Sequence, residues 1–343
     1  MRRLFVWAII TCLFFSCKQG ENDIVTYISL DESNLVTLDL KNEDWVILDS
    51  PKPIGRLFLA VFEDNYFLLR SQEELYLYTC DGQFVAKVSK KGRGNSEYMG
   101  IPDFGFIDNK VYLYDTRGNK VMFFDIFGRF LNYSTTIKDG NNDITFQSII
   151  KLGDEYIGKR MFRGVPGDPE LAVFDRDFCY IKNINASSMR LRSGNYYGEQ
   201  FAAYTSNSVL YNRSFDNKIY EVTRDTAKVR YSIDFDTETI DINKFYDESD
   251  IIKAINAKEG TYSTLIQDME YKDGLLSFNY SYTKDKNGCR VAVYDSATER
   301  AWHYRISSDE YVKDAYAHNG QIYVFTAGDE NKTKLYRFPI SRM

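Results

Sequence analysis

The feature that most constrains the fold of this chain is a phrase of about forty-five residues that recurs along it. In each copy a turn residue leads into a short strand rich in Val, Ile and Tyr, and a second strand and a turn with Asp or Gly follow. The clearest copy is FIDNKVYLYDTRGNKVMFFDIFGRFL at residues 106–131, and related copies lie at 61–85 and 318–338. A strand-rich repeat of this length predicts the blades of a β-propeller.

The turn residue that opens each second strand gives the number of copies. Its steps are 44, 45, 53, 67 and 46 residues, and the residues are Asn65, Asn109, Asp154, Asn207, Gly274 and Gly320. The two long steps contain insertions at 188–200 and 236–260. Apolar residues at helical spacing in the second insertion predict a short helix near residues 242–257. We therefore expect an all-β fold, a six-bladed β-propeller with four-stranded antiparallel blades.

The strand KVYLYD shows how a blade is expected to pack. Val111 and Leu113 point to one side of the sheet, whereas Tyr112 and Tyr114 point to the other. Both sides are apolar, which is typical of a sheet packed between two neighbouring blades, so the blades must stack in a ring. We expect residues 34–49 to supply strands that close this ring onto the last blade and remove exposed sheet edges.

The N-terminus, MRRLFVWAIITCLFFSC, has two arginines, an apolar run too short to span a bilayer stably, and a final cysteine. This pattern is similar to a bacterial lipoprotein signal, in which cleavage before the cysteine is followed by attachment of lipid to it. The alternative is an ordinary signal peptide with an incidental cysteine. We expect residues 1–16 to be the signal peptide, 17–33 to be the lipidated Cys17 and a tether, and 34–343 to form a single propeller.

Charge and cysteine content argue against several classes of partner and site. The formal net charge is -6 at pH 7 and no basic tract is present, so nucleic acid is not expected as a partner. Membrane attachment is expected through lipid on Cys17 rather than through a basic face. Cys80, Cys179 and Cys289 are odd in number and form no CxxC pair, which argues against a disulfide framework or a cysteine-based zinc site. The chain is expected to be a monomer.

Residues 45–135 carry a resemblance to a known family. The segments concerned are WVILDS, DGQFVAKVSKKGRGNSEYMGIPDFGF, KVYLYD and FFDIFGRFL. They resemble the six-bladed β-propeller lipoproteins of bacterial envelopes, which are related in architecture to NHL-repeat propellers. A family loop of the form G-x-G-P-G-E-Y corresponds to residues 92–98, where Asn95-Ser96 replaces Pro-Gly. The resemblance implies a lipid-anchored protein of the cell envelope, facing the periplasm or the cell surface. Many members have no assigned activity, and they often accompany glycan-uptake systems.

Basic and aromatic loops form the candidate binding surface. Loops that enter a blade's inner strand share one face of a propeller with loops that join its second and third strands. The candidate ligand-binding residues on that face are Arg93, Glu97, Arg160, Arg163, Arg192, Tyr196 and Tyr197, with Glu199 and Gln200 beside them. Arginine forks and aromatic platforms suit acidic sugars or the acidic loop of a partner. The alternatives are a solvated rim of unrelated charges and, for Arg93 and Glu97, pairing with each other.

No motif in the sequence indicates catalysis. His303 and His318 fall in different copies without a cysteine or histidine at ligand spacing, and no G-x-S-x-G elbow is present. We therefore expect a binding or scaffolding module for a glycan, a peptide or an envelope protein, with no catalytic residue and no assigned metal ligand. The alternative is a propeller hydrolase or lyase of the lactonase type, with calcium held in the central channel by carboxylate and amide oxygens. A purely structural propeller within a larger envelope complex is a third alternative.

Overall fold

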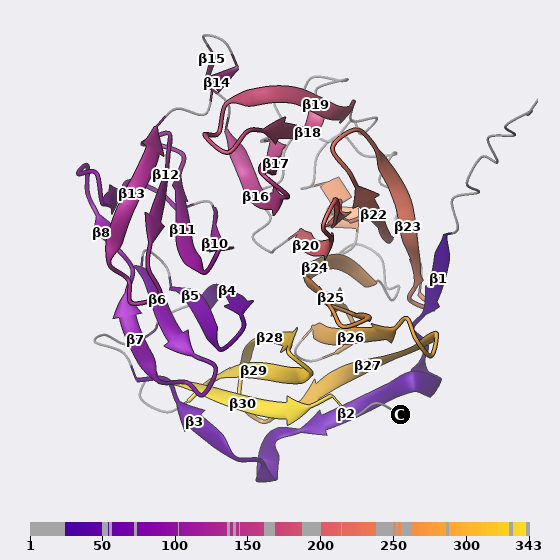
Figure 1. Cartoon of the computed structure of the whole chain (residues 1–343). Helices are drawn as coiled ribbons and strands as arrows, with labels where there is room; N and C mark the ends of the chain where they lie inside the picture. Colours follow the sequence, from indigo (N-terminus) through magenta and orange to yellow (C-terminus); the bar gives the residue numbers. More distant parts are fainter. Residues whose placement is uncertain are drawn as a thin grey trace, which may run out of the picture.

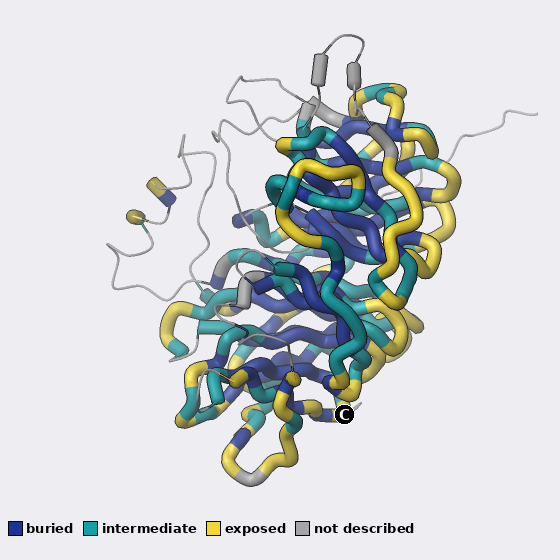
Figure 2. The backbone as a smooth tube through the Cα atoms, turned by 90° about the vertical axis from the view of Figure 1, so that its left-hand side faces the viewer, coloured by how far each residue is buried: buried dark blue, intermediate teal, exposed yellow. Residues whose placement is uncertain are grey.

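The computed structural model consists of six blades arranged around a central axis, as the repeat predicts (Figure 1). The described residues are 25–49, 54, 57–71, 74–101, 103–135, 138–139, 142–143, 145–160, 169–186, 200–213, 215–237, 250–251, 253–254, 263–285, 288–328 and 332–340. Seen from the side, buried backbone runs through the blades, and exposed backbone gathers at their rims (Figure 2).

Each blade begins at the axis and adds antiparallel strands outwards. The innermost strands are β4 (Leu57–Glu63), β10 (Asp103–Ile107), β16 (Phe146–Leu152), β20 (Phe201–Thr205), β24 (Ser263–Lys272) and β28 (Val312–His318). The second strands are β5 (Tyr66–Ser71), β11 (Lys110–Asp115), β17 (Glu155–Arg160), β21 (Ser208–Asn212), β25 (Leu275–Tyr282) and β29 (Gln321–Ala327).

The outer half of each blade follows the same plan. The third strands are β6 (Glu74–Thr79), β12 (Lys120–Phe124), β18 (Pro169–Phe174), β22 (Lys218–Val222), β26 (Cys289–Asp295) and β30 (Thr333–Pro339). The fourth strands are β7 (Phe84–Lys87), β13 (Phe130–Thr135), β19 (Tyr180–Ala186), β23 (Ala227–Asp234), β27 (Arg300–Ser307) and, in the sixth blade, β3 (Trp45–Ile47). Two small ribbons lie between blades and pair β8 (Lys90–Lys91) with β9 (Glu97–Tyr98) and β14 (Lys138–Asp139) with β15 (Asn142–Asp143).

The turn residues found in the sequence mark the blades correctly. All six stand one position before a second strand, from Asn65 before β5 to Gly320 before β29. Gly82 and Gly128, which close hairpins between third and fourth strands, have φ of 86° and 76°. Glycine adopts such positive φ values without a steric penalty, so these turns are tight.

The alternation predicted for KVYLYD is confirmed by the packing of β11. Val111 and Leu113 are fully buried in an apolar cluster shared with the first blade. Tyr112 and Tyr114 are buried in a different cluster, shared with the third blade. A blade therefore separates two cores, and each core belongs to a pair of neighbouring blades.

The ring is closed by the N-terminal part of the described chain, residues 26–47, which we call the strap. β1 (Thr26–Ser29) pairs in parallel with β23, β2 (Leu35–Asp39) pairs in parallel with β27, and β3 pairs antiparallel with β30. Two short 3-10 turns, η1 (Glu32–Asn34) and η2 (Leu40–Asn42), join these strands. The strap thus runs along the outer edges of the fourth and fifth blades before it completes the sixth (Figure 1).

The strap corrects two expectations drawn from the sequence. Only β3 closes the last blade, whereas β2, also within residues 34–49, covers the edge of the fifth blade. The tether expected to reach residue 33 is shorter, because residues 26–29 already pair with β23. The physical reason is that each outer strand presents unpaired backbone groups, and a parallel strand satisfies them. The expected signal peptide and Cys17 lie outside the described residues.

The expected insertion helix at residues 242–257 stays a prediction. The described part of this range, residues 250, 251, 253 and 254, has helical backbone, and the remainder lies outside the described residues. Among the residues that the structure describes, no helix is long and apolar enough to cross a bilayer.

A buried arginine holds the corner of the strap. The Arg290 side chain is 2% exposed, and it contacts Asp285 through Nε at 2.6 Å and Nη2 at 3.1 Å. Its Nη1 and Nη2 atoms reach Oε1 of Glu32 in the strap at 3.2 and 3.3 Å. The guanidinium carbon lies 3.6 Å from the centroid of the Tyr282 ring. The buried guanidinium therefore contacts two carboxylates and an aromatic ring.

A buried histidine, His303, holds the same corner of the strap through a hydrogen bond to the strap's backbone. The Nε2 atom of His303 donates to the carbonyl of Asp31 at 2.9 Å, and Nδ1 accepts from the hydroxyl of Tyr280. The bond that Nδ1 accepts requires the neutral ring. Burial lowers the pKa of His303, and the nearby Arg290 cation lowers it further, although the Asp31 carbonyl and the Glu32 and Asp31 carboxylates oppose this.

We predict that Arg290→Met destabilises the protein by about 3–5 kcal/mol, because the substitution leaves Asp285 as an unpaired buried carboxylate. Chemical denaturation monitored by tryptophan fluorescence measures this change. Arg176→Met is the control, since the Arg176 side chain is 84% exposed and its loss should change stability by less than about 0.5 kcal/mol. Equal effects of the two substitutions would contradict the role of Arg290 as a buried anchor.

We also predict that the contribution of His303 to the stability of the folded protein decreases at acidic pH. An unfolded histidine protonates near pH 6.5, whereas the pKa of the folded His303 is lowered by burial, so its contribution to stability is lost as pH falls from about 6.5 towards that lower pKa. Burial raises the pKa of Asp103 to about 7 and that of Asp314 to about 6, and these groups act in the opposite direction. The measurement is therefore the difference in Tm between the wild type and His303→Gln from pH 8 to pH 5. The difference should shrink as pH falls, and a constant difference would contradict the prediction.

Candidate functional site at the mouth of the central channel

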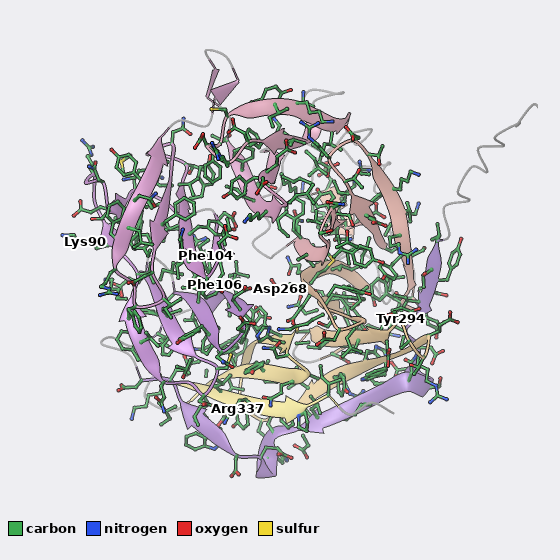
Figure 3. The ribbon with its side chains drawn as sticks, viewed as in Figure 1. Lys90, Phe104, Phe106, Asp268, Tyr294 and Arg337 are labelled. Atoms are coloured by element: carbon green, nitrogen blue, oxygen red, sulfur yellow. The ribbon has the colours of Figure 1, made fainter. Side chains whose placement is uncertain are left out.

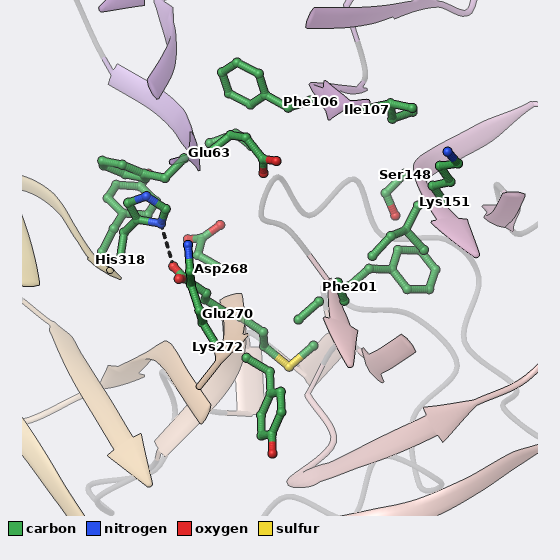
Figure 4. A pocket seen from close by; sticks show the side chains of 18 of the residues that line it. Glu63, Phe106, Ile107, Ser148, Lys151, Phe201, Asp268, Glu270, Lys272 and His318 are labelled. Atoms are coloured by element: carbon green, nitrogen blue, oxygen red, sulfur yellow. Dashed lines mark hydrogen bonds and ion pairs between the residues drawn. The ribbon is translucent and has the colours of Figure 1, made fainter. Parts of the chain in front are cut away.

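The six inner strands surround a cavity of about 380 Å³ at the axis of the ring (Figure 4). Every inner strand contributes residues to its wall. The ionisable residues of the wall, which together we call the channel mouth, are Glu63, Asp64, Asp108, Lys151, Asp268, Glu270, Lys272 and His318. Aromatic residues, among them Phe106, Phe201 and Tyr271, complete the lining.

The channel mouth lies on the face of the ring where first strands turn into second strands. Asp64 and Asp108 are in such turns, and Lys272 and His318 are the last residues of β24 and β28. Second strands begin on this face and end on the opposite one, so the loops that follow second strands and fourth strands are on the other side. The loop-rich face predicted from the sequence is therefore opposite the channel mouth.

Three ion pairs neutralise most of the charge in the channel mouth. The Lys151 ammonium contacts a carboxylate oxygen of Asp108 at 2.5 Å, across the seam between the second and third blades. The Lys272 ammonium lies 3.4 Å from Oδ1 of Asp64, and so joins the fifth blade to the first.

The third pair contains His318, which is 5% exposed. Its Nδ1 atom lies 2.7 Å from Oε2 of Glu270, and its Nε2 atom lies 2.9 Å from the carbonyl oxygen of Asp64. The same Nε2 atom also lies 2.9 Å from Nδ2 of Asn319. Because both ring nitrogens are engaged, His318 has no free nitrogen with which to act as a base. Its ring packs against Phe62, with centroids 5.2 Å apart.

Asp268 reaches the channel because β24 is bulged. The register of β24 against β25 shifts twice between Thr264 and Glu270. Asp268 has φ of 50°, in the left-handed region that is uncommon for residues other than glycine. Its carboxylate accepts a hydrogen bond from Nδ2 of Asn279 at 2.6 Å, and the same amide donates to the carbonyl of Ala315 at 3.1 Å. Figure 3 shows Asp268 beside the axis.

Glu63 differs from the other carboxylates of the channel mouth. Within the described part of the chain it makes no hydrogen bond and no ion pair, and in Figure 4 its carboxyl group points toward the centre of the cavity. Desolvation by the surrounding protein raises the pKa of Glu63, and the neighbouring Asp64 carboxylate raises it further. His318 and Lys272 lower it, but not enough to offset these two causes.

A second cavity of about 230 Å³ adjoins the channel mouth between the fifth and sixth blades. Glu270, Lys272 and His318 line both cavities, so the His318–Glu270 pair forms part of the wall between them. The second cavity continues along Leu275 and Val293.

The donor atoms of the channel do not suit calcium. Among the described residues, no group of three or more His, Cys, Asp or Glu side chains is placed to hold a metal ion. Three of the five carboxylates in the channel mouth already face a lysine or a histidine. Calcium requires six to eight oxygen ligands, so these residues do not fit the calcium site considered from the sequence.

The predicted binding residues are only partly described. Arg163, Arg192, Tyr196 and Tyr197 lie outside the described residues, as does Glu199. Arg160, at the end of β17, donates from Nη1 to Oδ1 of Asn183 at 3.2 Å. Gln200 lies buried at the axis, where it contacts Lys159.

Glu97 holds its own loop together. Its carboxylate accepts a hydrogen bond from the Gly94 amide at 2.9 Å and pairs with Lys90 at 3.0 Å. These bonds hold the pKa of Glu97 below its usual value. A Cβ atom at Gly92 would lie 2.1 Å from Glu97 Oε2, which explains why glycine stands there. Figure 3 places Lys90 at the outer edge of the ring, far from the axis.

Asp115 fixes the end of the same crossover. It is fully buried, and its carboxylate accepts from the backbone amides of Met99 at 3.0 Å, Gly100 at 3.1 Å and Arg117 at 3.2 Å. The exposed side chain of Arg93 makes no ion pair within the described part of the chain. The family-like loop thus acts as a connector between the first and second blades.

Comparison with known proteins agrees with the fold. A family model described as DUF5128, 6-bladed beta-propeller, matches residues 53–333. The chain belongs to this family. This DUF5128 protein is similar to a Bacteroides fragilis protein that is named, provisionally, as exported, with 16% identity, a TM-score of 0.65 and coverage of 92% of this chain and 99% of that one.

A second solved structure is a member of the DUF4221 family from Bacteroides vulgatus. It has 12% identity and a TM-score of 0.57, and the alignment covers 86% of this chain and 98% of that one. Similarity at these identities shows the fold alone. No curated protein matches the chain in sequence.

We predict that Asp115→Ala destabilises this DUF5128 protein by about 2–3 kcal/mol, because three backbone amides lose their buried acceptor. Glu97→Ala should lower Tm by less, since its bonds are at the surface. Arg93→Ala is the control and should leave Tm unchanged. Differential scanning calorimetry measures all three, and a fall in Tm for Arg93→Ala as large as that for Asp115→Ala would contradict the assigned roles.

Proposed function

We propose that this DUF5128 protein is an envelope-anchored binding protein that takes a small glycan into its channel mouth. Lipid on Cys17 would hold it to the membrane, facing the periplasm or the cell surface. The observation that carries the proposal is the cavity of about 380 Å³ at the axis, to which all six blades contribute. Ligand sites are typically concave and about 300–1,000 Å³ in volume. A peptide or an envelope protein is the alternative class of ligand.

The chemistry of the wall supports a glycan. Phe106, Phe201 and Tyr271 offer apolar rings beside hydrogen-bonding groups of both kinds. A sugar has apolar faces and hydroxyl edges, so it needs this combination of flat surfaces and polar partners. The charges that alternate around the channel mouth supply acceptors and donors for several hydroxyl groups.

The state of His318 and of the two lysines argues against catalysis by these three residues. A general base needs a free lone pair within reach of a substrate, and both nitrogens of His318 are engaged. The two lysines are paired with carboxylates, so neither amino group is free to act as a nucleophile. The protein of similar fold that is named, provisionally, as exported is consistent with a role outside the cytoplasm.

We predict that Ala203→Trp abolishes ligand binding. Ala203 lies on β20, lines the cavity and is exposed there, so the indole would fill the cavity without entering the core. The measurement is the rise in Tm caused by a panel of neutral, cationic and anionic mono- and disaccharides, since a ligand that binds only the folded state stabilises it. Ala297→Trp, in an exposed turn outside the cavity, is the matched control.

At least one saccharide should raise the Tm of the wild type and of Ala297→Trp, and none should raise that of Ala203→Trp. If no saccharide raises Tm, or if the response of Ala203→Trp equals that of the control, the glycan-binding proposal fails.

We predict that EDTA leaves the Tm of the protein unchanged, and that calcium added afterwards has no effect, because the channel carboxylates do not form a calcium site. The measurement is made on the chain from Lys18 onwards. A Tm that falls with EDTA and recovers with calcium would overturn this prediction and favour the lactonase-like alternative.

A further inference from the structure

The charges in the channel mouth do not cancel. Five carboxyl groups line the cavity, Glu63, Asp64, Asp108, Asp268 and Glu270, against two lysines and one histidine. Even with His318 counted as a cation, carboxylates are in excess. The whole chain has a formal net charge of -6, so its general field also favours the approach of cations.

Two carboxylates of the channel mouth lie outside its three ion pairs, Asp268, which accepts a hydrogen bond from Asn279, and Glu63. The two lysines face Asp108 and Asp64, and the histidine faces Glu270. Glu63, at the end of β4, lines the same cavity and makes no ion pair or hydrogen bond within the described residues. Its carboxyl points toward the centre of the cavity, where a ligand would meet it (Figure 4).

The surroundings of Glu63 suit an ammonium group. Asp268 and Asp64 place further carboxylates around the same cavity, and Phe62 and Phe106 also line it. Aromatic faces and carboxylates both attract an organic cation, and partial desolvation strengthens the attraction.

We propose that the ligand of the channel mouth carries a protonated amine, as in an amino sugar, and that Glu63 is its specificity-determining partner. This inference rests on the proposed function, because it names the class of ligand for the same cavity. The competing class is an anionic sugar, which would have to detach Lys151 or Lys272 from an aspartate.

The direction of the Glu63 pKa gives the proposal a second readout. A bound ammonium stabilises the carboxylate and so lowers the pKa of Glu63 from its raised value in the free protein. Affinity for a cationic ligand must therefore weaken as pH falls through that raised pKa. A neutral ligand that only accepts or donates hydrogen bonds has no such requirement.

The test uses three disaccharide probes that differ in charge: the cationic dimer of glucosamine, the neutral dimer of N-acetylglucosamine and the anionic dimer of galacturonic acid. Isothermal titration calorimetry measures Kd for each probe at pH 7 and pH 5 on the wild type, Glu63→Gln and Glu43→Gln. Glu43 is exposed and lies in the strap, away from the cavity, so Glu43→Gln controls for the change of one charge.

The cationic probe should bind the wild type and Glu43→Gln at least tenfold more tightly than the other two, and more weakly at pH 5 than at pH 7. Glu63→Gln should lose about tenfold in affinity for that probe alone. Equal effects of the two glutamine substitutions, or preference for the neutral or anionic probe, would overturn the inference. If the neutral or anionic probe is preferred and does not bind Ala203→Trp, the glycan-binding proposal survives. If no probe binds, both proposals fall.

Discussion

The pairing of β3 with β30 is the contact on which the rest of the structure depends. A blade with two apolar faces is stable only between neighbours, so the stack of blades must close into a ring. β3 stands near the start of the described chain and β30 near its end, and together they complete the sixth blade. A Cβ atom at Gly82 would lie 2.8 Å from Val46 Cγ2, so a glycine in the first blade lets that blade pack against the closing strand.

Closure of the ring determines where polar and ionisable side chains can lie. The spaces between blades are filled by apolar clusters. Polar side chains in these spaces form hydrogen bonds between the inner strands of neighbouring blades. The hydroxyl of Tyr316 in the sixth blade accepts from the Ala60 amide in the first at 3.0 Å. Asp103 in the second blade accepts from the Ile149 amide in the third at 2.8 Å. Ionisable side chains from several blades can meet without entering these cores only at the axis, where the channel mouth lies.

Much of the fold could be predicted from the sequence, because turn residues have local causes. Asn, Asp and Gly all favour turns, so the six residues that open second strands are visible without any tertiary information. The same alignment also contains part of the channel mouth. Glu63, Lys272 and His318 each stand two positions before one of these turn residues, in the first, fifth and sixth blades. A search for charged residues at that position would have found them.

Other parts could not be predicted, because they depend on closure and on irregular backbone. The path of the strap follows from which blade edges need a partner, and no local pattern in residues 26–47 specifies blade five for β2. Loop topology alone predicts that Glu97 lies on a binding face. In the structure its carboxylate instead accepts from the Gly94 amide and pairs with Lys90. A short loop motif with one acid can serve either purpose, and only the contacts distinguish them.

The irregular backbone of β24 is what places Asp268 in the wall of the channel mouth. Ile266 and Met269 both pack in the core between the fourth and fifth blades, although they are three positions apart. A regular strand would point them to opposite sides. The bulges allow both to stay buried while Asp268, at φ of 50°, lines the channel. A left-handed residue is retained where the surroundings require it, and such positions cluster at ligand sites. The simplest requirement here is that a carboxylate must face the axis.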